Sequence, residues 1–214
     1  GVVTTLAGSS SGSTDATGIS ARFNGPIGIT TDGTNLYVAD FLSNRIRKIV
    51  ISTGVVTTLA GSSQGSTDTA DGTPSFFRPR GITTDGTNLY VSEFGNHRIR
   101  KVVISTGVVT TFAGSSSGHT DATGTSARFR EPYGITIDGT NLYVADNKNH
   151  RIRKIVISTG AVTTLAGSSQ GYLDNATGTS AEFNSPYAIT IDGTNLYVAD
   201  TSNNRIRKIA LRGS

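Results

Sequence analysis

Acidic residues recur four times in the chain, each five positions before an arginine, and carboxylates in such an array could act as general acids or bases. An active site is normally one asymmetric constellation, so a feature that repeats four times favours a structural role. Because a guanidinium group can bind a carboxylate through two parallel hydrogen bonds, we predict ion pairs that fix a short loop. The predicted pairs are Asp40 with Arg45, Glu93 with Arg98, Asp146 with Arg151, and Asp200 with Arg205.

The three histidines raise the question of a zinc site. His97 and His150 occupy the same position in successive copies of a repeat, and His119 lies in a loop where other copies carry serine or tyrosine. No two of them have the spacing of a zinc-ligand pair, and the chain contains no cysteine. The recurring Asp-Gly-Thr-Asn lacks the alternating oxygen ligands and the closing glutamate of a calcium loop. We therefore expect no metal, no cofactor and no enzymatic activity.

Basic residues cluster in four Arg-Ile-Arg-Lys runs, which begin at Arg45, Arg98, Arg151 and Arg205. The whole chain holds 19 basic and 15 acidic residues, a net charge of only +4. Since side chains alternate between the two faces of a strand, the basic groups of one run cannot all converge on one edge. The sequence therefore disfavours RNA as a partner. Its apolar runs are short and interrupted by charge, so we expect no membrane span.

One repeat supplies the elements that position these residues. Gly-Val-Val-Thr-Thr begins at residues 1, 54 and 107, and Gly-Ala-Val-Thr-Thr begins at residue 160, a spacing of 53 residues. In the last copy an extra residue near Asn175 displaces the rest of the repeat by one position, which a loop tolerates. We therefore expect residues 1–214 to form a single unit of four repeats.

Each repeat has the pattern of a four-stranded antiparallel meander. In the copy that starts at Pro79, β-branched residues and period-2 patterning predict strands over residues 81–84, 89–92, 98–105 and 108–113. Glycine-containing turns join the first strand to the second and the third to the fourth. A long loop over residues 114–131 then leads to the next copy. Four short strands at this spacing predict an all-β fold, a β-propeller in which each repeat is one blade.

Asn96-His97-Arg98-Ile99 and Asn149-His150-Arg151-Ile152, each preceded by Leu-Tyr-Val and an acidic residue, resemble the NHL-repeat family of β-propellers. The inter-blade loop, with Leu-Ala-Gly-Ser at residues 165–168, is similar to the bacterial type. In all four copies, however, arginine replaces the leucine of the family's name. The resemblance implies two alternatives to a plain scaffold: binding of single-stranded RNA on a positive face, and a metal-dependent lyase.

The four copies are unusually alike, and this similarity favours recent amplification or an idealised design. The chain ends read as those of an excised or engineered four-repeat fragment. Nothing in the sequence indicates a compartment.

The copies differ most in the loops between their second and third strands and at the starts of their first strands. In a meandering blade these positions share one rim with the inter-blade loops, so we expect any ligand to meet this variable rim. Exposed aromatic groups there could stack on a protein, a glycan or a base of single-stranded RNA, although packing of the loops on their neighbours is an equal alternative. The candidate binding residues are Phe41, Arg80, Phe94, Tyr133, Lys148 and Tyr187.

The order of strands predicts self-association. The chain begins with an outermost fourth strand, residues 2–6, and ends with a third strand, residues 205–211. It lacks the Trp and Met that would fill the wide wedges of a four-bladed ring. We therefore predict a homodimer that closes an eight-bladed ring, in which each N-terminal strand completes the partner's final blade. A four-bladed monomer is the alternative.

Overall fold

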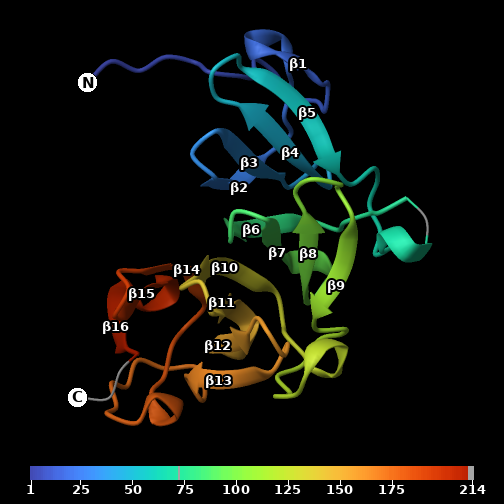
Figure 1. Cartoon of the computed structure of the whole chain (residues 1–214). Helices are drawn as coiled ribbons and strands as arrows, with labels where there is room; N and C mark the ends of the chain where they lie inside the picture. The colour runs from blue at the N-terminus through green and yellow to red at the C-terminus, as the bar shows by residue number, and fades with distance from the viewer. Residues whose placement is uncertain (72, 212–214) are drawn as a thin grey trace. The chain divides into compact units, whose positions relative to one another are not determined.

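A computed structural model describes residues 1–71 and 73–211 (Figure 1). The chain divides into two compact units, Gly1–Val91 with Lys101–Thr110, and Ser92–Arg100 with Thr111–Ser214. The described residues contain strands and short 3₁₀ turns but no α-helix, and none of their helical turns is long or apolar enough to cross a membrane. The 3₁₀ turns are η1 (Gly18–Ser20), η2 (Thr69–Asp71), η3 (Phe94–Asn96), η4 (Gly124–Ser126), η5 (Asn147–Asn149), η6 (Gly178–Ser180) and η7 (Thr201–Asn203).

The first sheet belongs to the first unit and has the order β1-β5-β4-β3-β2. Four of its strands form the predicted meander, and the short β1, from the loop that precedes the meander, pairs with the outermost strand β5. The bounds are β1 (Ala16–Thr17), β2 (Pro26–Thr31), β3 (Asn35–Asp40), β4 (Arg45–Val50) and β5 (Val55–Ala60).

Asp32 shows why Asp-Gly-Thr-Asn makes a tight hairpin between β2 and β3. Its carboxylate accepts hydrogen bonds from the backbone N–H groups of Thr34 and Asn35, at 2.9 and 2.7 Å, and from the Tyr37 hydroxyl at 2.7 Å. Gly33 supplies the φ of +89° that this turn requires. The repeated motif is therefore a turn with satisfied side chains.

The second sheet has the order β6-β7-β8-β9 and contributes to both units. Its strands agree with the predicted ranges to within two residues at every end: β6 (Pro79–Thr84), β7 (Asn88–Glu93), β8 (Arg98–Val103) and β9 (Val109–Ala113).

Two further sheets lie in the second unit. The third sheet is a complete meander of order β10-β11-β12-β13, with bounds Pro132–Ile137, Asn141–Asp146, Arg151–Val156 and Val162–Ala166. The fourth sheet has the order β14-β15-β16, with bounds Pro186–Ile191, Asn195–Asp200 and Arg205–Ala210. The four sheets are the blades of a propeller fold, and among the described residues the last blade lacks its outermost strand.

Residues 2–6, predicted as an outermost strand, form no strand in the single chain, and the dark blue segment at the N-terminus is drawn as coil (Figure 1). Val2 and Val3 are 94% and 95% exposed. The same sequence forms β5, and sequences that differ by one residue form β9 and β13, where the third strand of a blade is available as a partner. Among the described residues no third strand pairs with this segment, and its pairing with a second copy stays a prediction.

Each unit buries its own apolar core between successive blades. In the first unit Tyr37 and Ile46 of the first blade lie in one cluster with Phe76, Ile82 and Leu89. In the second unit the equivalent cluster contains Tyr143, Ile152, Phe183, Leu196 and Val198. Blade-on-blade packing through alternate strand residues therefore holds each unit together.

Candidate functional site

The recurring carboxylates pair with the second arginine of each Arg-Ile-Arg-Lys run. Asp40 and Arg47 are both fully buried and 3.1 Å apart, and the Arg47 guanidinium also reaches Asp15 at 2.7 Å. It donates to the backbone carbonyls of Arg22 and Thr14 and lies 5.0 Å above the ring of Phe23. Equivalent bridges join Asp146 to Arg153 and Asp200 to Arg207, each at 2.9 Å. These networks bind the third strand to the preceding loop, a structural role.

This arrangement corrects the predicted partners in three copies. Arg45, Arg151 and Arg205 stand opposite the carboxylates in the strand register but donate to the carbonyls of Ser13 and Ser62, of Ser168, and of Tyr172. The short Asp side chain is buried and reaches inward to the buried arginine. Glu93 is one methylene longer and bridges both Arg98, at 2.6 Å, and Arg100, at 3.2 Å.

His97 and His150 act as acceptors in the loops. Each has a left-handed backbone, with φ of 57° and 55°, and its Nδ1 accepts the backbone N–H of Glu131 or Ser185 at 3.1 Å. In the first copy Asn44 does the same through its Oδ1, which explains how Asn and His alternate at this position. Among residues 1–71 and 73–211, no three His, Cys, Asp or Glu side chains are grouped to hold a metal ion.

The structure brings three of the residues predicted for the variable rim into contact with one another. The rings of Phe94 and Tyr133 are 5.5 Å apart, and Tyr187 meets Tyr133 edge-on at 4.9 Å. Two side chains hold the backbone beneath them: Ser92 donates its hydroxyl to the Tyr133 carbonyl, and Asn147 donates its amide to the Pro186 carbonyl at 3.0 Å. We call Phe94, Tyr133 and Tyr187 the aromatic step.

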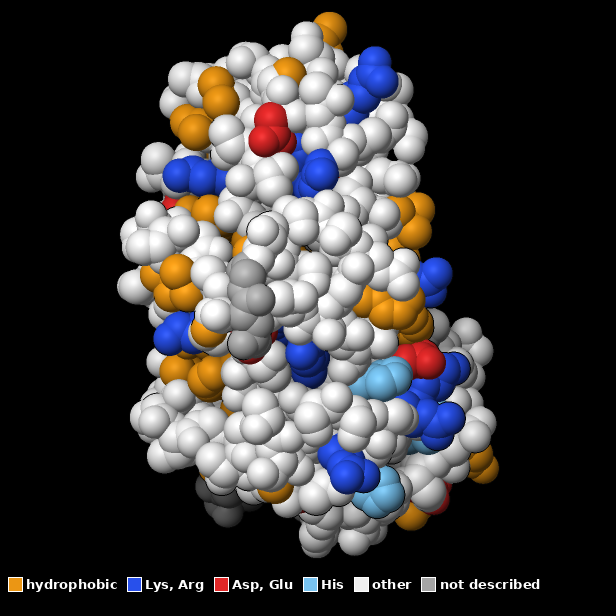
Figure 2. Space-filling model, turned by 90° about the vertical axis from the view of Figure 1, so that its right-hand side faces the viewer, with side chains coloured by type: hydrophobic (Ala, Val, Ile, Leu, Met, Phe, Trp, Pro, Cys, Tyr) orange, Lys and Arg blue, Asp and Glu red, His pale blue; other side chains and the backbone are white. Residues whose placement is uncertain are grey.

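The other candidate residues lie elsewhere. In the first unit the guanidinium groups of Arg80 and Arg78 lie 5.6 and 5.8 Å from the ring of Phe41. In the second unit Lys148 is exposed on η5, with its backbone N–H bonded to the carbonyl of Arg130. On the face drawn in Figure 2, Lys and Arg side chains lie singly or in small groups, without one continuous basic strip.

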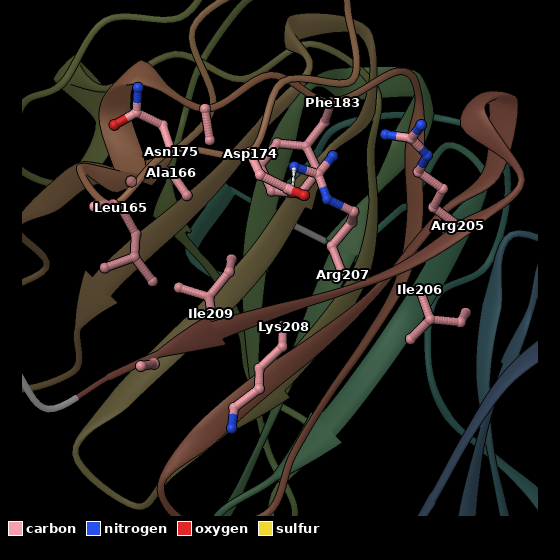
Figure 3. A pocket seen from close by; sticks show the side chains of 14 residues that line it. Leu165, Ala166, Asp174, Asn175, Phe183, Arg205, Ile206, Arg207, Lys208 and Ile209 are labelled. Atoms are coloured by element: carbon pink, nitrogen blue, oxygen red, sulfur yellow. Dashed lines mark hydrogen bonds and ion pairs between the residues drawn. The ribbon is translucent and has the colours of Figure 1, made fainter. Parts of the chain in front are cut away.

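A hollow of about 1050 Å³ runs along β16 in the second unit. Its walls are β16, the end of β13 at Leu165 and Ala166, and the loop from Asp174 to Phe183 (Figure 3). The carboxylate of Asp174 lies 2.6 Å from the guanidinium of Arg207 and is marked by the dashed line. Sequence reasoning missed this site, although the aspartate recurs in every copy, at residues 15, 68, 121 and 174, and was the available signal.

Comparison with known proteins agrees with this architecture. Residues 129–155 match the family model described as NHL repeat. NHL repeat-containing protein 2 of Gallus gallus is 28% identical over 97% of this chain and 34% of its own length. The chain thus spans about a third of that relative.

Solved structures show the same fold. An auxiliary nutrient-binding protein from Bacteroides ovatus superposes with a TM-score of 0.70 and 24% identity, over 89% of this chain and 49% of its own. Inactive virginiamycin B lyase from Staphylococcus aureus gives 0.51 and 19%, over 87% and 70%. The repeated blades, the two Asn-His-Arg-Ile segments and these matches lead to one conclusion: the chain has a β-propeller fold and is similar to NHL-repeat proteins.

Proposed function

We propose that this chain is a non-catalytic propeller scaffold that binds a protein or glycan ligand on its variable rim. The aromatic step carries the proposal. Phe94 and Tyr133 meet with tilted rings, and Tyr133 and Tyr187 meet edge to face. Together they present apolar surface beside phenolic hydroxyl groups, a combination suited to sugar faces and peptide side chains. The similar Bacteroides ovatus structure is described as a nutrient-binding protein, which supports a binding role.

The step is also prepared for binding. Tyrosine and phenylalanine have few rotatable bonds, and hydrogen bonds to the carbonyls of Tyr133 and Pro186 fix the backbone that carries the two tyrosines. A ligand therefore meets groups that lose little conformational entropy on binding.

Glycan and peptide arrays probed with the wild-type chain test the proposal. We expect Tyr133→Ala and Tyr187→Ala each to lower the affinity for any captured ligand by about tenfold, since stacked aromatic contacts contribute on the order of 1 kcal/mol or more. Tyr172→Ala is the matched control, because Tyr172 is exposed and contacts Arg205. Ligand capture that tolerates both step variants would contradict the proposal, and zinc-dependent turnover would favour the lyase alternative.

A second function, assembly into a homodimer, is supported by two exposed apolar faces. Ile29 on the first blade is 61% exposed, whereas its repeat equivalents Ile82 and Ile135 are buried. Ile206 on the last blade is 74% exposed, whereas Ile46 and Ile152 are fully buried. Burying such surfaces favours association, and two copies related by a twofold axis would cover all of them in an eight-bladed ring.

The solution mass tests the assembly. Light scattering should give a mass near twice 22.2 kDa. A mass near 22.2 kDa that does not change with concentration would rule out the dimer and favour the four-bladed alternative.

A further inference from the structure

We infer that the hollow along β16 is a binding site for one extended peptide, residues 1–7 of a second copy, and that Asp174 is the residue that captures it by binding Thr5. The inference rests on the proposed assembly and names the contact that makes it.

Complete blades show what Asp174 is built to do. In the first blade Asp15 bridges Arg47 and also accepts hydrogen bonds from Thr58 on the outermost strand, from its N–H at 2.9 Å and its hydroxyl at 3.0 Å. In the third blade Asp121 bridges Arg153 and accepts the same two bonds from Thr164, again at 2.9 and 3.0 Å. The aspartate of the preceding loop thus clamps the outermost strand to the arginine of the third strand.

In the fourth blade the clamp is assembled without its strand. Arg207 keeps both loop contacts, with the carbonyls of Glu182 and Leu173, and its bridge to Asp174. The Asp174 side chain is nevertheless 86% exposed, against 45% and 44% for Asp15 and Asp121. Its exposed carboxylate faces the hollow beside β16 (Figure 3). The protein has therefore positioned an acceptor where a strand's N–H and hydroxyl donors would arrive.

The loop on the far side of the hollow lacks its strand contact too. In the first blade Ala16 and Thr17 pair with Val56 and Val55, and in the third the N–H of Val162 donates to the carbonyl of Ala122. Among the described residues the equivalent Ala176 and Thr177 pair with no strand, and the N–H of Thr177 donates to the side chain of Asn175, the extra residue of this copy, at 2.8 Å. An incoming strand would thus find pairing partners along both of its edges.

Residues 1–7 are the matching occupant. Gly-Val-Val-Thr-Thr-Leu-Ala is identical to residues 54–60, which fill this place in the first blade, and Val2 and Val3 are exposed. The β4–β5 register, transferred to the fourth blade, pairs Ile206 with Ala7, Arg207 with Thr5, Lys208 with Thr4, and Ile209 with Val3. This register places the N–H and hydroxyl of Thr5 on the carboxylate of Asp174.

A second copy fits better than the chain's own N-terminus. The outermost strand leads through its loop into the next blade, so whichever molecule supplies residues 1–7 also brings its first blade to the Ile206 face. Within one chain this would need four wide wedges, and the chain contains no Trp or Met to fill them.

Sedimentation velocity on full-length point variants tests the clamp. We expect Asp174→Ala to raise the dimer dissociation constant about tenfold or more, because it removes charge-assisted hydrogen bonds to the strand. Thr5→Val, which removes one of the two bonds and keeps the shape, should raise it less, and the double variant should add little to Asp174→Ala. Asp15→Ala is the matched control: it removes the same clamp where the strand is covalently part of its own blade, so it should lower stability and leave the dimer constant unchanged.

A labelled peptide of residues 1–9 separates the clamp from the assembly. Val3→Asp should disable the chain's own strand and leave the hollow open, so this variant should bind the peptide, and Val3→Asp with Asp174→Ala should not. The inference is overturned if the wild type is a dimer, its dissociation constant does not change in the Asp174 and Thr5 variants, and the peptide does not bind. The assembly proposal would then still stand. A wild type that is monomeric would contradict the assembly proposal. If Val3→Asp then lowers the melting temperature of this monomer, the strand in the hollow comes from the same chain, and the inference that a second copy supplies it is overturned.

Discussion

The Nδ1 of His150 accepts a hydrogen bond of 3.1 Å from the backbone N–H of Ser185, and both residues have a left-handed backbone. The acceptor exists only while the imidazole is neutral, because a proton on Nδ1 would face another N–H. Burial is the main cause that lowers the pKa of both histidines. The charges of Lys148 and Arg130 lower the pKa of His150 further against the opposing charge of Asp200, and for His97 Glu131 opposes the lowering while Arg130 adds to it. The fold therefore favours the neutral form of both histidines.

We expect the double variant His97→Asn, His150→Asn to lose less stability than the wild type as the pH falls from 7 to 5. A histidine whose pKa is lowered on folding contributes its full stabilisation above its unfolded pKa of about 6.5, and this contribution is lost progressively as the pH falls from that value through the lower pKa of the folded state. Asparagine supplies the same acceptor without titrating, as Asn44 does in the first copy. Melting temperatures at the two pH values check this, and equal losses would contradict it.

The buried arginine should matter far more than the arginine at the rim. Arg153→Ala would leave Asp146 as an uncompensated buried charge, and we expect a loss of about 3 kcal/mol in the free energy of unfolding. Arg151→Ala removes a more exposed side chain bonded to the Ser168 carbonyl, and we expect a change within about 0.5 kcal/mol. Denaturant titration of the two variants side by side measures both; similar losses would refute the assignment.

Glycines after the outermost strands should be less replaceable than those in the hairpin turns. A Cβ on Gly61 would lie 2.6 Å from the Asn44 carbonyl oxygen and 2.9 Å from the Phe76 ring, at a φ of +93°. Gly33 has a similar φ of +89° but nothing within 4 Å. We expect Gly61→Ala to cost about 2 kcal/mol or more and Gly33→Ala about 1 kcal/mol. Equal losses of stability for the two variants in thermal denaturation would show that the atoms around Gly61 move aside at little cost in free energy.

The exposed isoleucines give a direct handle on assembly. Ile206→Asp and Ile29→Asp each place a charge on an exposed apolar face, so we expect the mass by light scattering to fall towards 22.2 kDa while the circular dichroism spectrum of the chain stays unchanged. The matched control is Ile51→Asp, since Ile51 is exposed in a hairpin turn and its repeat equivalents Ile104 and Ile157 lie in the same turns. A dimer mass that survives both face variants would contradict assembly through these faces.

The strands were predictable because each is bounded by turns whose chemistry is local: the hairpin that Asp32 and Gly33 make is repeated with the same hydrogen bonds in all four copies. The ion-pair partner of Asp40 was not predictable from the sequence. Arg45 and Arg47 lie on the same side of one strand, and only their burial in the fold determines which of them binds the carboxylate. The clamp at Asp15 was equally hidden, since its partners Arg47 and Thr58 lie 32 and 43 residues away. Of the rim residues, the sequence marked Tyr133 and Tyr187 as variable but held no information on the contact between their rings.

The one-strand offset between the repeat in the sequence and the blade in the fold has a consequence for how this chain could be produced and inherited. Each repeat in the sequence begins just before the outermost strand of a blade, so the repeat boundary lies within a sheet and not between two sheets. If the covalent chain is broken at a repeat boundary, the backbone hydrogen bonds of that sheet still join the two sides. During synthesis residues 1–7 leave the ribosome long before β16, the strand whose equivalents they match. Duplication or deletion of one whole repeat keeps this offset unchanged. Copy number can therefore change by whole repeats while each sheet keeps its strand order.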